Sequence, residues 1–487
     1  MTDFCRAHAS FRNFSNRLAA SDRIAGLRAG IIGEGVMIPG LAGSNPLLYA
    51  DYVASGRALR QIEDFVTEDV LPYYANSHTE ASFCGSYMTR MRRSAREVIA
   101  ELCGADNRYA TIFTGSGATN GINRLVRLLN IEERVEQGEK PLVLIGPYEH
   151  HSNILPWRET GAQVIEIGEA ERGGPDLSEL SDVLAAASGR FIVGAFSAAS
   201  NVTGIITDVG AVTQQLKRYG ALAIWDFAGG GPYLPIDMGT GGQADIDAIV
   251  VSPHKFLGGP GSSGVLIVRK SVVTSRRPTF SGGGTVQFVS PWVHDFSDDV
   301  VAREEAGTPN VIGDIRAALC FQVKDAIGQD YLDRRQEELR QRAMAVWRTN
   351  DNLRILGNPK AEHKLPIFSF QVFDPRKGGL IHQQLFTRML SDVYGIQARG
   401  GCACAGPYAH RLLGISEEQS EGIRQEILEG NEIEKPGWTR LNLSALMSDE
   451  KAEKVIAAVD ELARNPYPHC ETYQADISTA RYMAEAM

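Results

Sequence analysis

The chain has 487 residues, 43% apolar and 22% charged, and this ordinary globular composition excludes wholesale disorder and fibrous structure. Its net charge of −10 gives no electrostatic signature of a nucleic-acid-binding protein. No apolar run approaches the ~20 residues that a membrane-spanning helix needs, and no apolar core of a secretory signal opens the chain. We therefore expect a cytoplasmic protein that binds neither nucleic acid nor membrane.

Cysteine usage is sparse. The chain has seven cysteines, an odd number, which predicts a reducing compartment and no disulfide framework. Only Cys402 and Cys404 lie close together, in the segment Arg399-Gly-Gly-Cys-Ala-Cys404. Because no second pair stands at zinc-ligand spacing, we expect no metal site.

The first 44 residues are expected to form an N-terminal arm. The stretch 11–30 is rich in arginine, so an organelle transit peptide is an alternative, which Asp22 weakens. An ordinary N-terminal helix is the simpler interpretation.

Short apolar strands alternate with amphipathic helices through the middle of the chain. This pattern predicts a mainly parallel sheet with helical crossovers, in a large domain over residues 45–312. Ligands of such sheets bind at the carboxyl ends of the strands. The predicted strands are 111–114, 141–145, 163–167, 191–196, 221–225, 248–251 and 264–268, and the predicted helices are 119–129, 177–187 and 209–219.

The pattern changes after about residue 310. A long helical stretch over 313–349 precedes a strand at 367–372, a helix at 381–390 and a closing strand–helix pair at 439–443 and 449–464. We expect a smaller C-terminal α/β domain over 313–465 and an extended tail over 466–487.

A glycine-rich turn joins the first predicted strand to a helix, in Ile112-Phe-Thr-Gly-Ser-Gly-Ala-Thr-Asn120. Free backbone N–H groups at a helix N-terminus form a site for an anion. The turn lacks the lysine of a nucleotide-binding P-loop and the glycine spacing of a dinucleotide site. It suits one isolated phosphate, or it is a plain strand–helix turn.

Two charged residues follow other apolar strands. Asp226 ends Ile224-Trp-Asp, where a partly desolvated carboxylate needs a cationic partner, although a helix N-cap is the alternative. Lys255 ends Ile249-Val-Val-Ser-Pro-His-Lys, where a partly buried amine has a lowered pKa and acts as a nucleophile. Together, the phosphate turn, the aspartate and the lysine are the parts that hold pyridoxal 5′-phosphate.

With these motifs the chain resembles the class V aminotransferase superfamily, and within it the cysteine desulfurases and selenocysteine lyases. The most specific match combines Ser252-Pro-His-Lys255 with Arg399-Gly-Gly-Cys-Ala-Cys404. The similarity covers about four-fifths of the chain, from Leu48-Tyr-Ala-Asp to Thr439-Arg-Leu-Asn. It implies the α/β type I pyridoxal-phosphate fold, a homodimer, and an N-terminal segment that packs on the small domain.

The resemblance also implies residue roles. Lys255 matches the cofactor-linking lysine, Asp226 the partner of the ring nitrogen, and His150 the histidine that stacks on the ring and moves protons. It assigns no role to the neighbouring His151. Further cofactor contacts are implied for Ala118, Thr119, Asn201, Ser252, His254 and Thr308, the last reaching the phosphate of the other subunit.

The substrate side of the site is matched by three residues. Arg440 matches the arginine that binds the substrate carboxylate, and Arg399 stands five residues before Cys404, which matches the persulfide-forming nucleophile. The implied reaction converts L-cysteine to L-alanine and leaves a persulfide on Cys404. A protein that accepts the sulfur from this persulfide is a further implied partner.

Two positions depart from the family pattern. Gly229 replaces the usual Gln or His three residues after the strand-end aspartate, and Cys402 stands where His or a variable residue is usual. Cys402 is open to three interpretations: a resolving thiol, a second sulfur acceptor or a packing residue. These departures leave two alternatives: another class V reaction (selenocysteine lyase, aminotransferase or epimerase), or a non-catalytic sulfur-relay protein on the same fold.

Overall fold

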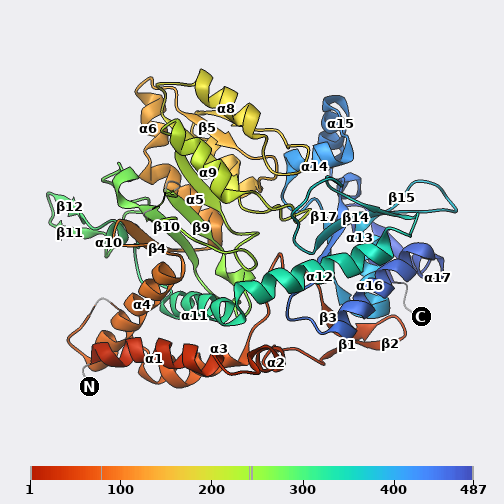
Figure 1. Cartoon of the computed structure of the whole chain (residues 1–487), viewed down its shortest axis with the longest axis horizontal. Helices are drawn as coiled ribbons and strands as arrows, with labels where there is room; N and C mark the ends of the chain where they lie inside the picture. The colour runs from red at the N-terminus through yellow and green to blue at the C-terminus, as the bar shows by residue number, and fades with distance from the viewer. Residues whose placement is uncertain (1–2, 78, 241, 243–244, 485–487) are drawn as a thin grey trace.

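The computed structural model describes residues 3–77, 79–240, 242 and 245–484, with backbone only for residues 3–6. A seven-stranded sheet forms the larger part of the molecule, and a smaller sheet lies beside it (Figure 1). The large sheet has the order β4 (Tyr109–Gly115), β10 (Gly264–Arg269), β9 (Ala248–Val251), β8 (Leu222–Asp226), β7 (Ile192–Ser197), β5 (Leu142–Ile145) and β6 (Gln163–Glu166).

The direction of its strands confirms the predicted fold class. Strands β5 to β9 pair in parallel, and only β10 runs antiparallel to both of its neighbours. Each predicted strand and helix of this region appears within two residues of its expected bounds.

Both faces of the large sheet are buried because its strands are apolar on both sides. In β9, Ala248 and Val250 pack on one face, and Ile249 and Val251 on the other. One face is covered by α5 (Gly117–Leu128) and α7 (Leu155–Arg158). The other is covered by α4 (Phe83–Leu102), α8 (Leu177–Ala186), α9 (Val209–Arg218) and α11 (Val311–Ile327). Shorter helices α6 (Ile131–Glu136) and α10 (Val300–Glu304) and the hairpin β11 (Val286–Val289)–β12 (His294–Phe296) complete this part.

The smaller sheet has its own core. Its order is β13 (Leu353–Ile355), β14 (Ile367–Phe373), β18 (Trp438–Asn442) and β17 (Arg399–Gly401), with β15 (Leu380–Ile381) paired to β14. Its helices are α13 (Gln383–Tyr394), α14 (Gly406–Leu413), α15 (Glu417–Leu428) and α16 (Asp449–Arg464). Strand β3 (Leu48–Tyr49) pairs in parallel with β16 (Ile396–Gln397), so an early segment of the chain lies against this sheet.

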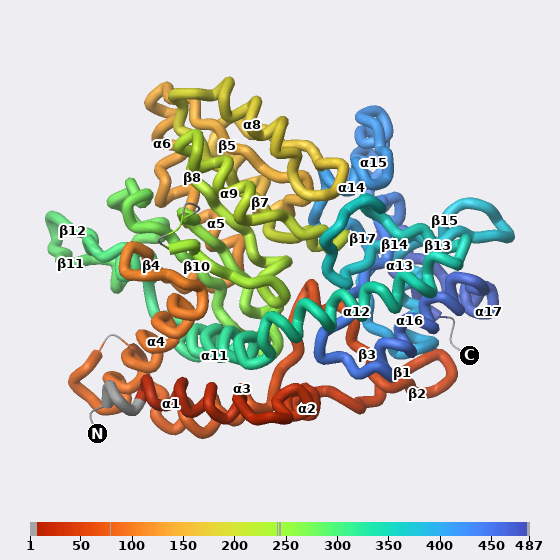
Figure 2. The backbone as a smooth tube through the Cα atoms, in the orientation of Figure 1, coloured from red at the N-terminus to blue at the C-terminus, as the bar shows by residue number. Residues whose placement is uncertain are grey.

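The long helical stretch expected over 313–349 is confirmed, and it consists of two helices. It divides into α11 and α12 (Gln329–Trp347) at Gly328, whose φ of 85° lies outside the helical range. Helix α12 then crosses from one core to the other, with Leu332 in the large core and Leu339 and Trp347 in the small one (Figure 2).

The segments at the two ends of the chain pack against the two cores. Helix α1 (Asp3–Leu18) buries Phe11 and Phe14 in the large core, and α2 (Arg23–Ala29), the hairpin β1 (Met37–Gly40)–β2 (Gly43–Pro46) and α3 (Arg60–Phe65) follow it. The region expected as an extended tail instead forms α17 (Tyr467–Cys470) and the hairpin β19 (Tyr473–Asp476)–β20 (Arg481–Ala484), with Tyr473 in the small core. Residues 1–2 and 485–487 lie outside the described residues. No helix in the described ranges is long and apolar enough to cross a membrane.

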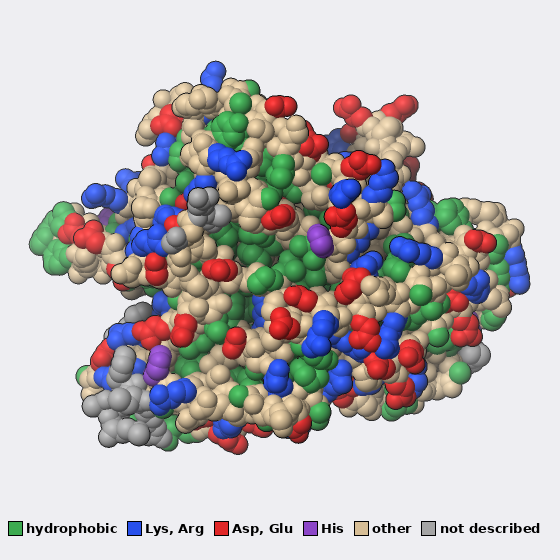
Figure 3. Space-filling view, in the orientation of Figure 1, with side chains coloured by type: hydrophobic (Ala, Val, Ile, Leu, Met, Phe, Trp, Pro, Cys, Tyr) green, Lys and Arg blue, Asp and Glu red, His purple; other side chains and the backbone are tan. Residues whose placement is uncertain are grey.

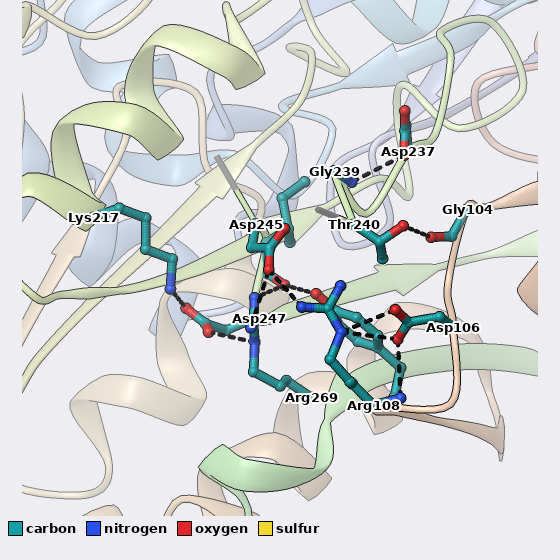
Figure 4. A network of polar contacts seen from close by, with 12 residues as sticks. Gly104, Asp106, Arg108, Lys217, Asp237, Gly239, Thr240, Asp245, Asp247 and Arg269 are labelled. Atoms are coloured by element: carbon teal, nitrogen blue, oxygen red, sulfur yellow. Dashed lines mark hydrogen bonds and ion pairs between the residues drawn. The ribbon is translucent and has the colours of Figure 1, made fainter. Parts of the chain in front are cut away.

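A network of ion pairs closes the end of the large sheet away from the strand-end residues predicted to bind the cofactor (Figure 4). Asp247, which precedes β9, has a side chain only 4% exposed and pairs with Lys217 of α9 and with Arg269 Nε at 3.2 Å. It also accepts a hydrogen bond from the Ala223 N–H at 2.8 Å. This carboxylate therefore ties β8, β9, β10 and α9 together.

We expect Asp247→Ala to lower the free energy of unfolding by about 3 kcal/mol, because it leaves Lys217 and one buried N–H group without their acceptor and removes one of the two carboxylates that contact Arg269. Urea-induced unfolding followed by far-ultraviolet circular dichroism measures this loss. Asp106→Ala is the control, since Asp106 pairs with the half-exposed Arg108 in the same network and its removal should leave stability nearly unchanged. An equal effect of the two substitutions would contradict the structural role of Asp247.

Candidate active site

A cavity of about 210 Å³ lies at the carboxyl ends of the parallel strands of the large sheet. Its walls bring together eight of the residues predicted to bind the cofactor: Ala118, Thr119, His150, Asn201, Asp226, Ser252, His254 and Lys255. Gly229 also lines it. Positions far apart in the sequence therefore meet in one concave site, as the strand-end argument requires.

The phosphate end of the cavity is formed by the N-terminus of α5. The Ala118 N–H donates to Ser252 Oγ at 2.9 Å, and Thr119 Oγ1 lies 2.7 Å from Ser152 Oγ. Gly117 has φ of 65°, and a Cβ there would lie 2.8 Å from Ser252 Oγ and 3.0 Å from the His254 ring. Only glycine therefore permits this close approach, and a helix N-terminus with the hydroxyl-bearing residues Thr119, Ser152 and Ser252 in the cavity lining suits an anion.

Asp226 and Lys255 lie at the ends of adjacent parallel strands. Burial raises the pKa of Asp226, whose Oδ1 accepts a hydrogen bond from the Ala228 N–H at 2.7 Å. Burial is the main reason that the pKa of Lys255 is lowered to about 8. The negative charge of Asp226 opposes this shift, and the positive charges of Arg440 and Arg399 add to it. The amine therefore has a larger neutral fraction near neutral pH than an ordinary lysine, and nucleophilic attack requires the neutral form.

His150 is held in one tautomer. Its Nδ1 accepts a hydrogen bond from the Ser152 N–H at 3.1 Å, so in the neutral ring Nε2 carries the proton. Burial lowers the pKa of His150 to about 4, and Lys255 adds to the shift. The imidazole is therefore neutral at neutral pH.

Asn201 and Gly229 form the wall beside Asp226. Asn201 Nδ2 donates to the Ala403 carbonyl at 3.0 Å, whereas its buried Oδ1 has no hydrogen-bond partner among the described residues. A Cβ at Gly229 would lie 3.2 Å from the Ala199 carbonyl oxygen, so backbone closes this wall where a longer side chain is usual. The unpartnered Asn201 Oδ1 is the acceptor that the cavity offers at this wall.

Cys404 is exposed, and the residue before it, Ala403, is hydrogen-bonded to Asn201 of the cavity wall. Ala403 and Cys404 both have left-handed backbone conformations, with φ of 55° and 54°. Such residues cost about 1–2 kcal/mol each and persist only where contacts hold them. Here the Ala403 carbonyl is bound by Asn201, and the Cys404 carbonyl accepts a hydrogen bond from the His151 N–H at 2.9 Å.

The two predicted substrate arginines share one carboxylate. Arg399 Nε lies 2.9 Å from Asp51 Oδ2, and Arg440 Nη2 lies 3.0 Å from Asp51 Oδ1. Arg440 Nη1 also donates to the Asn201 carbonyl at 3.1 Å, which links this group to the cavity wall. Thr308 is exposed, and the described lining of the cavity does not include it.

Comparison with known proteins gives the family. The family model for aminotransferase class-V matches residues 48–425. The chain belongs to the class V aminotransferase family. This confirms the predicted family.

Individual members of the class V family are also similar to this chain. A probable cysteine desulfurase of Vibrio cholerae is 28% identical over 423 residues, covering 86% of this chain and 94% of the relative. One of Streptomyces coelicolor is 28% identical, with 75% and 85% covered. The solved apo structure of a cysteine desulfurase from Thermococcus onnurineus superposes with a TM-score of 0.71 at 23% identity, covering 86% of this chain and 95% of that one. This likeness confirms the predicted fold.

Three residues with contacts in or beside this class V site were not predicted from the sequence: Asp51, Glu149 and His151. Asp51 and Glu149 lie inside motifs used for the resemblance, and His151 had no assigned role. Glu149 accepts hydrogen bonds from Ser197 Oγ and Asn153 Nδ2, both at 2.6 Å, and burial raises its pKa to about 7. The only signal in the sequence was the position of Glu149 and His151 beside His150.

His151 connects the large sheet to the Cys404 loop. Its Nε2 accepts a hydrogen bond from the Gly406 N–H at 2.8 Å, at the start of α14. We expect His151→Ala to leave cofactor content unchanged and to raise the rate of Cys404 alkylation by iodoacetamide several-fold, because the loop loses a contact of about 1 kcal/mol. His469→Ala, on the remote α17, is the control. An unchanged alkylation rate in His151→Ala would contradict this tether.

Proposed function

We propose that the protein is a pyridoxal-phosphate-dependent cysteine desulfurase, which converts L-cysteine to L-alanine and forms a persulfide on Cys404. One arrangement carries the proposal: the half-buried Lys255 and the buried Asp226 lie in a cavity whose wall residue Asn201 is bonded to the loop that presents Cys404. The names of the similar proteins support the same activity.

The residues of the cavity fit pyridoxal phosphate. The α5 N-terminus with Thr119, Ser252 and His254 would hold the phosphate, Asp226 the ring nitrogen, and the unpartnered Asn201 Oδ1 the ring hydroxyl. Asp226 fits because a buried carboxylate with one backbone donor gains from a cationic partner. When bound, the cofactor supplies an electron sink for bonds broken at the substrate α-carbon.

The chain's own residues supply positioning, proton movement and the nucleophile. Lys255 provides an amine with a lowered pKa, and His150, whose Nε2 carries a proton, would lie against the cofactor ring and exchange protons. The Cys404 thiolate attacks the substrate sulfur: a sulfur–sulfur bond forms, the carbon–sulfur bond breaks, and the carbon skeleton takes up a proton and leaves as L-alanine. The exposure of Cys404 leaves the persulfide open to a sulfur-acceptor protein.

Product analysis tests this function. Protein loaded with pyridoxal phosphate and given L-cysteine and dithiothreitol should release L-alanine and sulfide in equal amounts. Formation of pyruvate, or of alanine without sulfide, would contradict it.

The location and assembly of the protein are part of the proposal. All six cysteines whose side chains the structure describes are free thiols, which fits a reducing cytoplasm.

The hairpin β11–β12 carries apolar side chains at its end (Figure 3), with Phe288 52%, Val289 61% and Trp292 87% exposed. A patch of this kind is typical of an interface, and a second copy of the chain is its proposed occupant.

We expect Trp292→Ser to shift a homodimer toward monomers, because the most exposed aromatic anchor of the interface is removed. Sedimentation velocity measures the change. Leu428→Ser is the matched control, since Leu428 is 68% exposed on α15, outside the hairpin. A dimer that withstands Trp292→Ser, or a wild-type monomer, would contradict the assignment.

Gly229 favours a second candidate function on the same cofactor. The Gln or His side chain that usually hydrogen-bonds the cofactor oxygen is absent at this wall, and this departure favours another reaction on the same cofactor, that of a selenocysteine lyase, aminotransferase or epimerase. Exchange of the α-proton in deuterated water, measured over a panel of amino acids, separates the two. Fastest exchange with cysteine supports the desulfurase, whereas a different preferred amino acid supports the alternative.

A further inference from the structure

A second cavity, of about 460 Å³, lies where α12 meets the smaller sheet, and it shares no lining residue with the cofactor cavity. Helix α12 contributes Arg340, Met344 and Trp347, whose spacing of four and three residues places them on one face of the helix. Strands β13 and β14 and the segment between them supply other parts of the wall. A cavity of this volume is typical of a binding site for a small molecule.

The inner wall of this second cavity is apolar. Trp347 packs edge-on against Phe368, with the ring centroids 4.8 Å apart. The buried apolar side chains that line the cavity are Trp347, Leu353, Leu356, Leu365, Ile367 and Phe368. A ligand with an apolar body would gain free energy by leaving water for this wall.

Three cations line the second cavity, Arg340, Arg348 and Lys364, and no carboxylate of the described residues does. Glu337 engages Arg340, since its two oxygens accept hydrogen bonds from Nε and Nη2 at 2.7 and 2.6 Å. The Arg348 side chain makes no ion pair or hydrogen bond within the part of the chain that the structure describes. Lys364 Nζ donates to the Asn358 carbonyl, which carries no charge. Arg348 and Lys364 therefore bring positive charge to the cavity without a carboxylate partner.

These cations lie close enough to repel one another. Burial lowers the pKa of Lys364, and the positive charges of Arg340 and Arg348 lower it further. The negative charge of Glu169 opposes this shift, but Glu169 does not line the cavity. Cations gathered beside an apolar wall, in a chain whose net charge is −10, are stabilised when an anion joins them.

The position of Lys364 is fixed by hydrogen bonds on both sides of it. The Leu365 N–H donates to the Gly204 carbonyl at 2.8 Å, and the His363 carbonyl accepts a hydrogen bond from the Ile206 N–H at 3.0 Å. The cation is therefore already held in place, and a ligand that binds it loses little free energy in ordering the site.

We propose that the second cavity binds a small molecule with an apolar body and one carboxylate, and that Lys364 and Arg348 together bind the carboxylate. The wall accepts either an aliphatic or an aromatic body, and the probes of the test distinguish the two. The proposal goes beyond the proposed function and does not depend on it, because the two cavities have separate linings.

The test compares each acid with the neutral alcohol of the same body. Calorimetry of the pyridoxal-phosphate-loaded protein gives dissociation constants for octanoate and 1-octanol, and for 2-naphthylacetate and 2-naphthaleneethanol. At least one acid should bind in a one-to-one, saturable way and about 10-fold more tightly than its alcohol, because only the acid pairs with the cations. Tighter binding of octanoate identifies an aliphatic ligand, and tighter binding of 2-naphthylacetate identifies an aromatic one.

Two variants locate the carboxylate. Lys364→Met should weaken binding of the acid about 10-fold, and Arg348→Met, which removes the more exposed cation, several-fold. Neither should change binding of the alcohol, since the apolar wall is intact. Arg354→Met is the matched control: it removes the same charge, but Arg354 is exposed between the lining residues Leu353 and Ile355 and its side chain points to the other face of β13.

Three results would overturn the proposal. The first is the absence of saturable binding of both acids at millimolar concentration. The second is equal affinity for acid and alcohol, which would show that the cations take no part. The third is a loss in Arg354→Met as large as in Lys364→Met, which would show that binding follows the net charge of the protein and not this cavity.

Discussion

Lys255→Ala is expected to abolish the release of alanine and sulfide from L-cysteine, with a loss of at least about 1,000-fold. The reason is that Lys255 is the half-buried lysine that lines the cavity, with its pKa lowered to about 8, and Asp226 lies at the end of the neighbouring strand. The loss should be accompanied by loss of the visible absorbance of the bound cofactor, measured after dialysis of the loaded protein.

Lys324→Met is the matched control. Lys324 is also half-buried with its pKa lowered to about 8, but its amine donates to the Leu234 carbonyl, and neither residue lines the cavity. Methionine fills the same space, so the rate and the cofactor absorbance should stay at wild-type levels. Equal losses in the two variants would show that activity follows general packing of buried lysines, not the chemistry of residue 255.

Cys404→Ser is expected to lower alanine formation from L-cysteine by about 100-fold or more, because a hydroxyl is a far weaker nucleophile toward sulfur than a thiolate. Cofactor absorbance should be unchanged, since Cys404 lies outside the lining of the cavity. Quantification of alanine by chromatography measures the rate, and mass spectrometry of the intact wild-type protein should show one added sulfur atom.

Cys402→Ser separates the two neighbouring thiols. Cys402 is half-buried beside the apolar cluster of Tyr408 and Trp438, whereas Cys404 is exposed. We expect Cys402→Ser to retain most of the rate. Alanine release at the parental rate by Cys404→Ser would exclude the persulfide mechanism.

The strand-end residues were predictable because local pattern and topology agree there. Asp226 and Lys255 each follow an apolar run, and a parallel sheet brings the carboxyl ends of its strands to one edge. The α5 turn was predictable for the same reason, since a glycine-rich segment joins a strand to an amphipathic helix. The cavity therefore holds the expected residues.

Other features depend on contacts that no local pattern contains. Asp51 and Arg399 are 348 positions apart, and only the pairing of β3 with β16 and of β17 with β18 brings them together. The break at Gly328 was not predicted, because one glycine costs a helix only about 1 kcal/mol and the helical spacing of apolar residues continues on both sides of it. The packing of residues 466–484 depends on a few apolar side chains, such as Tyr473. The spacing of apolar residues in this segment is too irregular to predict these contacts.

Covalent trapping of the cofactor tests the central claim most directly. Loaded protein is reduced with borohydride, digested and mapped by mass spectrometry. We expect a reduced pyridoxal-phosphate group on the peptide that contains Lys255 and none on the peptide that contains Lys324, which is also half-buried. An unmodified Lys255 peptide from fully loaded protein, or a label on another lysine, would contradict it.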